Sequence, residues 1–350
     1  MQIGPVAVGD NHPCFIIAEL SANHGGSLET ALQTIRAAKQ AGADAIKLQT
    51  YTPDTITLDS RNDYFKLSHG TLWDGRYLYE LYQEAYTPWE WHEQLFQAAR
   101  DEGLVCFSSP FDTTAVDLLK QLNAPAYKIA SFEIVDIPLV RYVARQQKPV
   151  IISTGIAELA DIELAVRTCQ EVGNAQIALL KCTSSYPAPI DRAHLRTIPD
   201  MQQRFRTVVG LSDHTLGIVS PVVAVSLGAK IIEKHFILDK SLGGPDASFS
   251  LDLAEFTEMV TAVRQAEAAL GQVNYELSNS TRQSRQQAGR SLFVVQDVKA
   301  GDIISPDNVR SIRPGHGLPP QHYDEVLGQT FAVDLDRGTP LSFDLIHLEQ

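Results

Sequence analysis

Cysteine is scarce in this chain, and no two cysteines are closely spaced. The 350 residues include only Cys14, Cys106, Cys169 and Cys182. Their spacing excludes a CxxC motif and a disulfide-rich scaffold, so we expect reduced cysteines, mostly in the core. No apolar run approaches the ~18 residues of a membrane span. The first twenty residues lack a basic stretch followed by an apolar one, so we expect no signal peptide and a cytoplasmic protein without a membrane partner.

Positive charge is also scarce. The 29 Lys and Arg residues against 42 Asp and Glu residues give a formal net charge of −13. An acidic chain has no general electrostatic attraction to nucleic acid or to anionic membranes, so we expect neither as a partner. Binding of an anionic substrate would therefore need local positive charge from a few Lys or Arg residues, a metal or helix N-termini.

Short apolar runs alternate with amphipathic segments along most of the chain. Runs of this length and composition are typical of strands that are buried on both faces of a parallel sheet. The predicted strands cover residues 15–18, 45–48, 105–108, 127–130, 150–153, 177–180, 208–211 and 230–233. Predicted helices lie at 27–41, 88–102, 114–122, 160–171, 218–227 and 253–270. Eight strands that alternate with helices indicate a (β/α)8 TIM barrel.

Two segments depart from this alternation. Residues 52–86 form one long, aromatic-rich connection after the second strand, which predicts either a wall of the active-site mouth or a surface that packs on another subunit. Residues 273–289 are polar and predict a linker, followed by a small domain at 290–350 with short strand-like runs. The barrel is then expected to occupy residues 1–272.

Polar residues gather where the predicted strands end, which is the functional side of a parallel barrel. His214 and His235 follow neighbouring strands, and with a carboxylate such as Glu19 they form a set that suits Mn, Fe, Co or Zn. Because a single histidine is more often structural, only the combination favours a metal site. Other polar residues at or just beyond these ends are Lys47, Gln49, Ser108, Lys128, Ser131, Glu133, Ser153, Ser184 and Ser212.

Two lysines, Lys47 and Lys128, are predicted to point to the same mouth. In an acidic protein such a pair marks an anion site, although a single lysine is more often a rim residue. Asp246 lies in a Gly/Pro-rich loop beyond His235 and is open to two interpretations, a sugar-binding acid or a plain turn residue. A lysine of this pair would also suit a Schiff-base aldolase, against which the histidine pair argues.

Eight segments spread over nearly the whole chain together resemble the sialic acid synthase family. They are FIIAELSANHGG, DAIKLQTY, FSSPFD, YKIASFEI, IISTGIA, LLKCTSSYP, GLSDHTLG and IIEKHFILDKSLGGPDASFSLD. The tail SLFVVQDVKAGDIISPDNVRSIRPGHGLPP resembles the antifreeze-like (SAF) domain of the same family. The resemblance implies a metal-dependent condensation of phosphoenolpyruvate with an acylamino sugar. A non-catalytic sugar-binding protein is the alternative from another class, but it has no use for this set of polar residues.

The resemblance also implies roles for individual residues. His214 and His235 match the metal ligands, usually of Mn²⁺, with Mg²⁺ or Co²⁺ as alternatives, and Glu19 and Glu133 match catalytic acids. Arg313 matches an arginine that reaches the partner's sugar in a domain-swapped homodimer, and Asp246 matches a sugar-contacting acid. The remaining substrate-binding positions are Lys47, Gln49, Ser108, Lys128, Ser131, Ser153, Ser184, Tyr186 and Ser212.

Within the family, the segments AELSANH and LWDGRYLYELYQEAYTPWEWH are closest to members that use a 2,4-diacetamido-2,4,6-trideoxy hexose. Ser184 stands where typical N-acetylneuraminate synthases carry asparagine, which puts one phosphate contact in doubt and argues mildly against N-acetylmannosamine as the acceptor. N-acetylneuraminate and legionaminate synthases remain the alternatives within the family.

Overall fold

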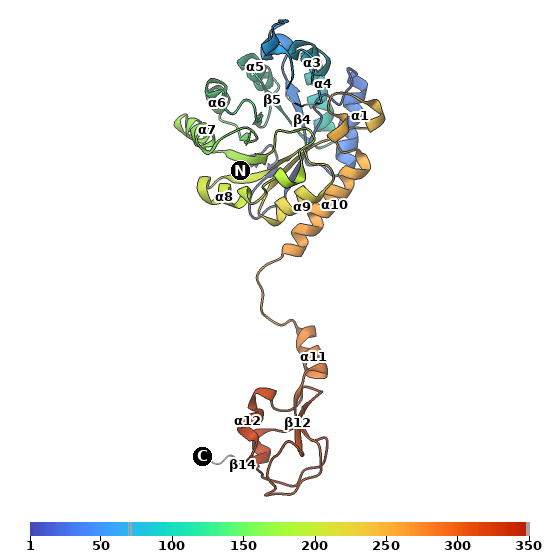
Figure 1. Ribbon diagram of the computed structural model, residues 1–350, viewed down its shortest axis with the longest axis vertical. Coiled ribbons are helices and arrows are strands. Elements are labelled where there is room, and N and C mark those ends of the chain that lie inside the picture. The colour runs from blue at the N-terminus through green and yellow to red at the C-terminus, as the bar shows by residue number, and fades with distance from the viewer. Residues whose placement is uncertain (69, 71, 348–350) are drawn as a thin grey trace. The chain divides into compact units, whose positions relative to one another are not determined.

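The first compact unit of the chain is a closed barrel of eight parallel strands. The computed structural model describes residues 1–68, 70 and 72–347, and it contains two units, Met1–Gly271 and Gln272–Gln350. The barrel strands are β3 (Phe15–Glu19), β4 (Ala45–Thr50), β5 (Val105–Pro110), β6 (Tyr127–Ile129), β7 (Val150–Ser153), β8 (Ile177–Cys182), β9 (Val208–Asp213) and β10 (Ile231–His235). They pair in sequence order, and β10 closes the barrel on β3 (Figure 1). The predicted TIM barrel and all eight of its strands are confirmed.

Helices surround the barrel and connect its strands (Figure 1). Several of their N-termini carry side-chain caps: Ser27 accepts from the Thr30 amide, and Asp252 and Glu255 form a reciprocal capping box. The helices are α1 (Leu28–Gln40), α4 (His92–Asp101), α5 (Thr113–Gln121), α6 (Ile137–Ala144), α7 (Leu159–Glu171), α8 (Thr197–Phe205), α9 (Val219–Ser226) and α10 (Leu253–Leu270). Helices α6 and α8 were not predicted. Among the described residues, no helix is long and apolar enough to cross a membrane.

The inside of the barrel changes from apolar to polar along the strands. Strand side chains alternate between the barrel interior and the helix layer. Near the amino ends, the interior is filled by Phe15, Phe107 and Ile231, and Ile3 and Val8 from the N-terminal hairpin pack into the same cluster. This hairpin, β1 (Gln2–Ile3) and β2 (Val6–Ala7), was not predicted. Because the interior near the amino ends of the strands is apolar, the charged side chains of the described interior lie toward the carboxyl ends.

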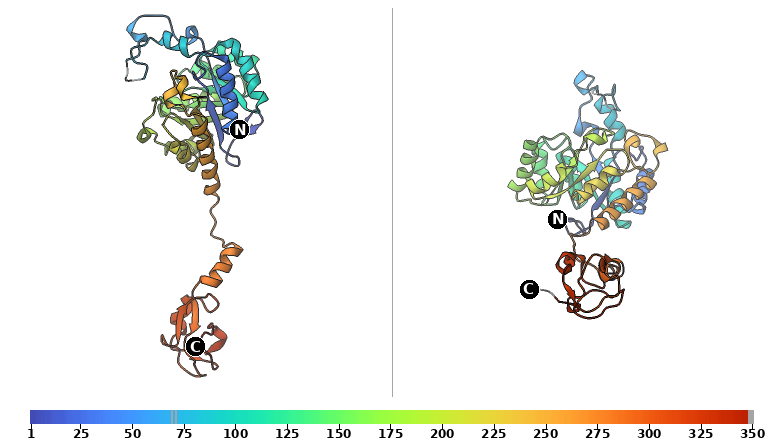
Figure 2. Two further views of the ribbon diagram at one scale, coloured as in Figure 1. Left: turned by 90° about the vertical axis from the view of Figure 1, so that its right-hand side faces the viewer. Right: turned by 60° about the horizontal axis from the view of Figure 1, so that its bottom comes forward.

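The long connection after β4 contains short helices and projects from the barrel (Figure 2). Its elements are α2 (Pro53–Ile56), the 3-10 helix η1 (Asp63–Phe65) and α3 (Leu78–Ala85). Residues 69 and 71 of this predicted connection lie outside the described residues. Tyr51, at the end of β4, packs edge-on against Tyr82 of α3, with ring centroids 5.5 Å apart. The aromatic residues therefore attach the connection to the barrel.

The second unit has its own small core. Its elements are α11 (Asn279–Ala288), β11 (Ser291–Val294), β12 (Val309–Ile312), α12 (Tyr323–Val326), β13 (Thr330–Phe331) and β14 (Ile346–His347). Its core contains Leu292, Val309, Phe331 and Leu341. Helix α11 occupies most of the segment predicted as a linker. It buries none of its residues, so no apolar stripe marked it in the sequence. Residues 348–350 of the predicted domain lie outside the described residues.

Candidate active site at the barrel mouth

A buried network of charges lies at the carboxyl ends of the barrel strands. The Lys47 Nζ atom lies 3.0 Å from Glu19 Oε2 and 3.0 Å from Glu233 Oε1. Lys128 Nζ lies 3.3 Å from the same Glu233 oxygen. Glu19 and Lys47 are register partners on β3 and β4, which places them side by side. The structure therefore brings the two predicted lysines together around Glu233, for which sequence analysis had assigned no role.

The two acids of this network differ in their affinity for a proton. Burial disfavours ionisation of Glu233, but Lys128 and Lys47 outweigh it and hold the pKa of this carboxyl at about 2. Burial raises the pKa of Glu19 to about 7, because the attraction of Lys47 only partly offsets the cost of burying the charge and repulsion by Glu233 adds to the rise. Glu19 is therefore the member of the pair that can exchange a proton near neutral pH.

Polar side chains extend the network on the barrel interior. Ser212 donates to Glu233 Oε1 at 3.1 Å, and Gln49 donates to Glu19 Oε1 at 3.1 Å. Lys47 Nζ also lies 3.4 Å from Ser109 Oγ. Gln49 and Ser212, both predicted, lie in this network, and so does Ser109, which ends the same strand as Ser108 but was not among the predicted substrate-binding residues.

Ser108, predicted as a substrate-binding residue, belongs to a different layer. It is buried and shares a 2.6 Å hydrogen bond with Thr50, whose hydroxyl lies 2.8 Å from His92 Nε2 of α4. Because neighbouring residues of a strand point to opposite faces, Ser109 faces the interior and Ser108 faces the helices. Of the two serines, Ser109 therefore lies at the charge network, and a role of Ser108 in substrate binding stays a prediction.

Three βα-loops converge on a cluster of hydroxyl groups around Gly155. Ser131 Oγ accepts a 3.1 Å hydrogen bond from the Gly155 amide. A Cβ atom at position 155 would lie 2.1 Å from Ser184 Oγ and 2.7 Å from Ser131 Oγ, so any other residue would have to displace both hydroxyl groups. Ser153 Oγ is buried without a hydrogen-bond partner among the described residues. Hydroxyls gathered around the Gly155 backbone, on the loops that follow β6, β7 and β8, make a cradle suited to a phosphate group.

Replacing Gly155 by alanine is expected to damage this cradle without unfolding the barrel. The added methyl group has to push the Ser131 and Ser184 side chains aside. If phosphoenolpyruvate is the anionic substrate, as the family resemblance implies, its KM should rise about tenfold or more, since each lost hydrogen bond to an anion costs about 1.5–3 kcal/mol. Initial rates at varied phosphoenolpyruvate measure this. Gly173→Ala is the control, because at its φ of +80° an added methyl group strains the backbone without crowding any atom within 4 Å, so it should lower the Tm and leave this KM unchanged. An unchanged KM would contradict the cradle.

The two predicted metal-binding histidines are neighbours, with ring centroids 5.3 Å apart. The Nδ1 atom of His214 lies 3.0 Å from the Thr183 carbonyl oxygen, to which it donates, so Nε2 is left as a possible ligand. His235 Nδ1 is buried without a hydrogen-bond partner among the described residues and lies 3.8 Å from Asp246 Oδ2. Burial lowers the pKa of His235 well below its usual value, which favours the neutral ring that binds metals.

The fit of these residues to a divalent metal is good but incomplete. An imidazole nitrogen without a partner, beside a second imidazole and a carboxylate, is a suitable donor set. Within the described ranges, however, no three His, Cys, Asp or Glu side chains are arranged as a ready metal site. Glu19, which was expected to complete the set, is paired with Lys47. The remaining ligands would have to come from water or from substrate.

An aromatic wall lies over the histidines. The Tyr186 ring is 4.3 Å from His214 and 5.2 Å from Phe249, centroid to centroid. Trp73, from the long connection, is 5.7 Å from Tyr186 and donates from Nε1 to the Pro245 carbonyl at 3.3 Å. The connection therefore reaches the barrel mouth, as the first interpretation of its sequence predicted.

The sequence matches known families in both units. Residues 34–275 match the NeuB family, and residues 289–346 match the SAF domain. The pseudaminic acid synthase of Campylobacter jejuni is 50% identical over 341 residues, which cover 97% of this chain and 98% of that protein. The chain belongs to the NeuB family. The pseudaminic acid synthase of Helicobacter pylori is 48% identical over 332 residues, which cover 95% of this chain and 97% of that protein.

A solved structure supports the membership of this chain in the NeuB family. The N-acetylneuraminic acid synthetase of Leptospira borgpetersenii superposes with a TM-score of 0.73 at 32% identity, over 81% of this chain and 94% of that one. The recognition of the family from its motifs is thereby confirmed, as are the barrel and the C-terminal SAF domain.

Three further predicted residues of this NeuB-family chain lie in distinct surroundings. Asp246 is no plain turn residue, because it is buried and accepts hydrogen bonds from the Ser21 hydroxyl and, at 3.4 Å, from the Ala22 amide. Glu133, beyond β6, has one carboxyl oxygen buried without a partner among the described residues, and burial raises its pKa to about 7. Arg313 is exposed in the second unit, directly after β12.

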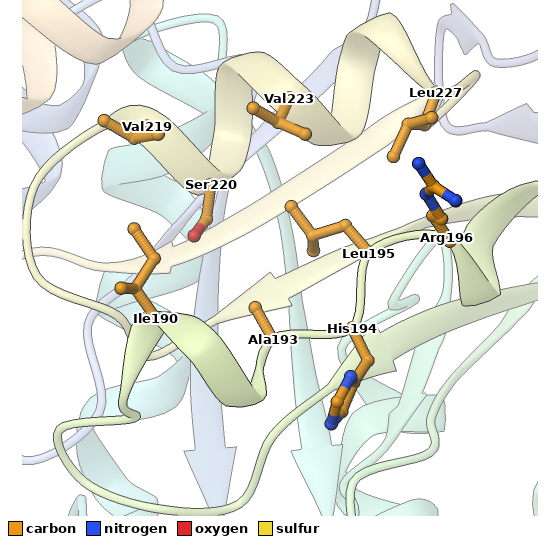
Figure 3. Close-up of a pocket in the computed structure, with 9 residues that line it drawn as sticks. All are labelled: Ile190, Ala193, His194, Leu195, Arg196, Val219, Ser220, Val223 and Leu227. Carbon is orange, nitrogen blue, oxygen red and sulfur yellow. The ribbon is translucent and has the colours of Figure 1, made fainter.

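An apolar cleft of about 350 Å³ lies on the outside of the barrel and not at its mouth. It separates Val219 and Val223 of α9 from Ile190 and Leu195, as Figure 3 shows. None of the predicted site residues lines it. The cleft is therefore no part of the candidate active site.

Proposed function

We propose that this chain is a pseudaminic acid synthase. It condenses phosphoenolpyruvate with 2,4-diacetamido-2,4,6-trideoxy-L-altrose and water to give pseudaminic acid and phosphate. The observation that carries this proposal is the 50% identity to the Campylobacter enzyme over nearly the full length of both chains. The buried lysines, hydroxyl cradle and histidine pair supply groups that such a transferase needs.

We propose that the lysines and hydroxyls hold phosphoenolpyruvate. Lys47 and Lys128 supply positive charge, and Ser131, Ser153 and Ser184 supply donors near Gly155. Because both lysines are buried and held by Glu233, and Ser131 is buried and held by the Gly155 amide, they position the anion at little further cost in entropy when the second substrate arrives. The serine at position 184 can donate to phosphate, so the absence of the usual asparagine does not remove the contact.

In the proposed reaction, C3 of phosphoenolpyruvate forms a bond to the aldehyde carbon of the open-chain sugar. Water adds to C2, and phosphate leaves from the resulting tetrahedral centre. A divalent metal held by His214 and His235, which we propose to be Mn²⁺ with Mg²⁺ or Co²⁺ as alternatives, would polarise the aldehyde when bound. Glu133 or Glu19 takes the proton of the attacking water, since the pKa of each carboxyl is raised to about 7.

The rate is expected to rise with pH through about 7. A general base acts only when it has lost its proton, and a carboxyl with a raised pKa is largely protonated below that value. Profiles of kcat/KM between pH 5.5 and 8.5 measure this limb. The variants Glu133→Gln and Glu19→Gln show which acid is the base. The rise of kcat/KM with pH should be missing from the residual activity of the variant that lacks the base. A flat wild-type profile would exclude both acids.

We also propose a domain-swapped homodimer, in which Arg313 of one chain reaches the sugar in the partner's barrel. The support is the SAF match over residues 289–346, together with the exposure of Arg313. Subunits carrying Arg313→Ala and His235→Ala, co-expressed with two tags, would form heterodimers with one intact site. At low sugar concentration we expect the unselected mixture to recover about a quarter of wild-type activity, because random pairing makes about half of the dimers heterodimers with one intact site of two. Heterodimers isolated through both tags should recover about half. Heterodimers without recovery would contradict the exchange.

The proposed function is tested by phosphate release from phosphoenolpyruvate in the presence of Mn²⁺. The altrose and N-acetylmannosamine are offered separately, each with a chelator control. Release with the altrose alone supports the proposal. Release with N-acetylmannosamine alone would make the chain an N-acetylneuraminate synthase, and release only with another diacetamido sugar would favour the legionaminate alternative. No release with any sugar would favour a non-catalytic role. The cytoplasmic location stays a prediction.

A further inference from the structure

Ser21 has an unfavourable backbone conformation inside the site. It follows β3 with a φ of 48°, in the left-handed region that glycine adopts readily and serine does not. Its side chain is 3% exposed. Of the described non-glycine residues with positive φ, which are Ser21, Asn123, Gln147, His194 and Arg206, only Ser21 is buried. A strained backbone at a buried site persists only where other interactions compensate for its cost, so the contacts of the Ser21 side chain indicate why serine stands here.

The Ser21 hydroxyl joins the two halves of the site. It accepts a hydrogen bond from Gln49 Nε2 at 3.0 Å and donates to Asp246 Oδ2. The same Gln49 nitrogen donates to Glu19 Oε1 at 3.1 Å, and Asp246 Oδ2 lies 3.8 Å from His235 Nδ1. An uninterrupted series of polar contacts thus runs from the charge network to the histidine pair, with Ser21 at its centre.

The fold itself does not depend on this hydroxyl. The loop after β3 is already tied to the segment after β10 by Asn23, which donates to the Phe236 carbonyl at 3.0 Å and to Ser250 Oγ at 2.8 Å. The Phe236 amide also donates to the Glu19 carbonyl at 2.8 Å. A glycine at position 21 would keep these contacts and suit the backbone better.

We propose that Ser21 is a positioning residue for the acceptor sugar. In the described part of the chain, the side-chain contacts of Asp246 run through Oδ2 to Ser21, Ala22 and His235. Since the Ser21 hydroxyl holds that oxygen, the orientation of the carboxylate is fixed and Oδ1 is left for a sugar hydroxyl or acetamido N–H. The inference rests on the proposed condensation and adds a residue that determines how tightly the sugar binds.

Variants of Ser21 separate the hydroxyl from the backbone. Ser21→Gly removes the hydroxyl and relieves the backbone, Ser21→Ala removes only the hydroxyl, and Ser21→Thr keeps a hydroxyl on a side chain still less suited to positive φ. Arg206→Gly is the matched control, because it relieves a positive φ of 52° at an exposed position after α8.

We expect binding of the sugar to follow the hydroxyl and Tm to follow the backbone. The KM for the sugar should rise about tenfold in Ser21→Gly and Ser21→Ala, the loss expected for a hydrogen bond to a charged group, while the KM for phosphoenolpyruvate stays within about twofold. Ser21→Gly should melt no lower than wild type, like Arg206→Gly, whereas Ser21→Ala and Ser21→Thr should melt lower. Ser21→Thr should keep a sugar KM close to that of wild type.

A purely structural role gives the opposite pattern. The inference is overturned if Ser21→Gly keeps the wild-type sugar KM, or if the KM values of both substrates rise together as Tm falls. If Ser21→Thr does not fold, the comparison of Ser21→Gly with Ser21→Ala still decides. Failure of the proposed function is seen separately, because the wild-type enzyme would then not turn over the altrose. The same comparison would be made with the acylamino sugar it does accept.

Discussion

Replacing Lys47 by methionine is expected to abolish turnover and to destabilise the barrel by about 3–5 kcal/mol, the usual cost of leaving a buried charge unpaired. Two buried carboxylates, Glu19 and Glu233, share this ammonium group at 3.0 Å each. Without it, they face each other across a nearly dry interior, and the anion site loses one of its two lysines. We expect a loss of at least about a thousandfold in kcat/KM, because oriented charge at a buried anion is worth several kcal/mol.

Denaturant unfolding and phosphate-release kinetics measure the two effects of the Lys47 change. The control is Lys299→Met, which removes an equally short ion pair, 2.8 Å to Asp334, from the surface of the second unit. Exposed pairs contribute little, so this control should leave both quantities unchanged. A Lys47→Met enzyme that turned over normally would show that the buried charges are structural only.

Removal of divalent metal is the second change with a large expected effect. If His214 and His235 hold the ion, a chelator should lower turnover about a thousandfold, since Lewis-acid stabilisation is worth several kcal/mol. Added Mn²⁺ should restore it. His235→Ala should lose bound metal as well as activity, because it removes the imidazole whose Nδ1 has no hydrogen-bond partner among the described residues.

Metal content after dialysis provides a readout independent of turnover. His322→Ala is the matched control, because His322 pairs with Glu325 at 2.8 Å in the second unit and has no proposed metal role. It should keep both metal and activity. Full activity in the presence of chelator would show that the reaction needs no metal. Full metal occupancy in His235→Ala would show that His235 is not a ligand.

The barrel was predictable because its strands are short apolar runs that are buried on both faces. Such runs are visible without knowing which face each residue occupies, and helices with an apolar stripe separate them. The same regularity places strand ends together, so Lys47, Lys128, His214 and His235 could be expected to meet before any contact was known.

Features that depend on the direction of a side chain or on steric crowding were harder to predict from the sequence. A strand that ends in two serines does not reveal which one faces the interior, and so Ser108 was chosen where Ser109 lies beside Lys47. Glu233 was undecided because its role follows from sharing one oxygen with two lysines of distant strands. Gly155 and Ser21 matter through crowding and backbone angle, which sequence patterns do not report.

Apolar side chains close the barrel interior at the amino ends of the strands, so the site is reached only from the carboxyl ends. Ile3 and Val8 of the N-terminal hairpin pack against Phe15 and Ile231, so this end offers no exit for a charged molecule. Phosphate and the sugar acid must therefore leave by the route through which their precursors entered. Each turnover then requires the mouth to be cleared before the next phosphoenolpyruvate can enter, and the two products compete with fresh substrate for the same passage.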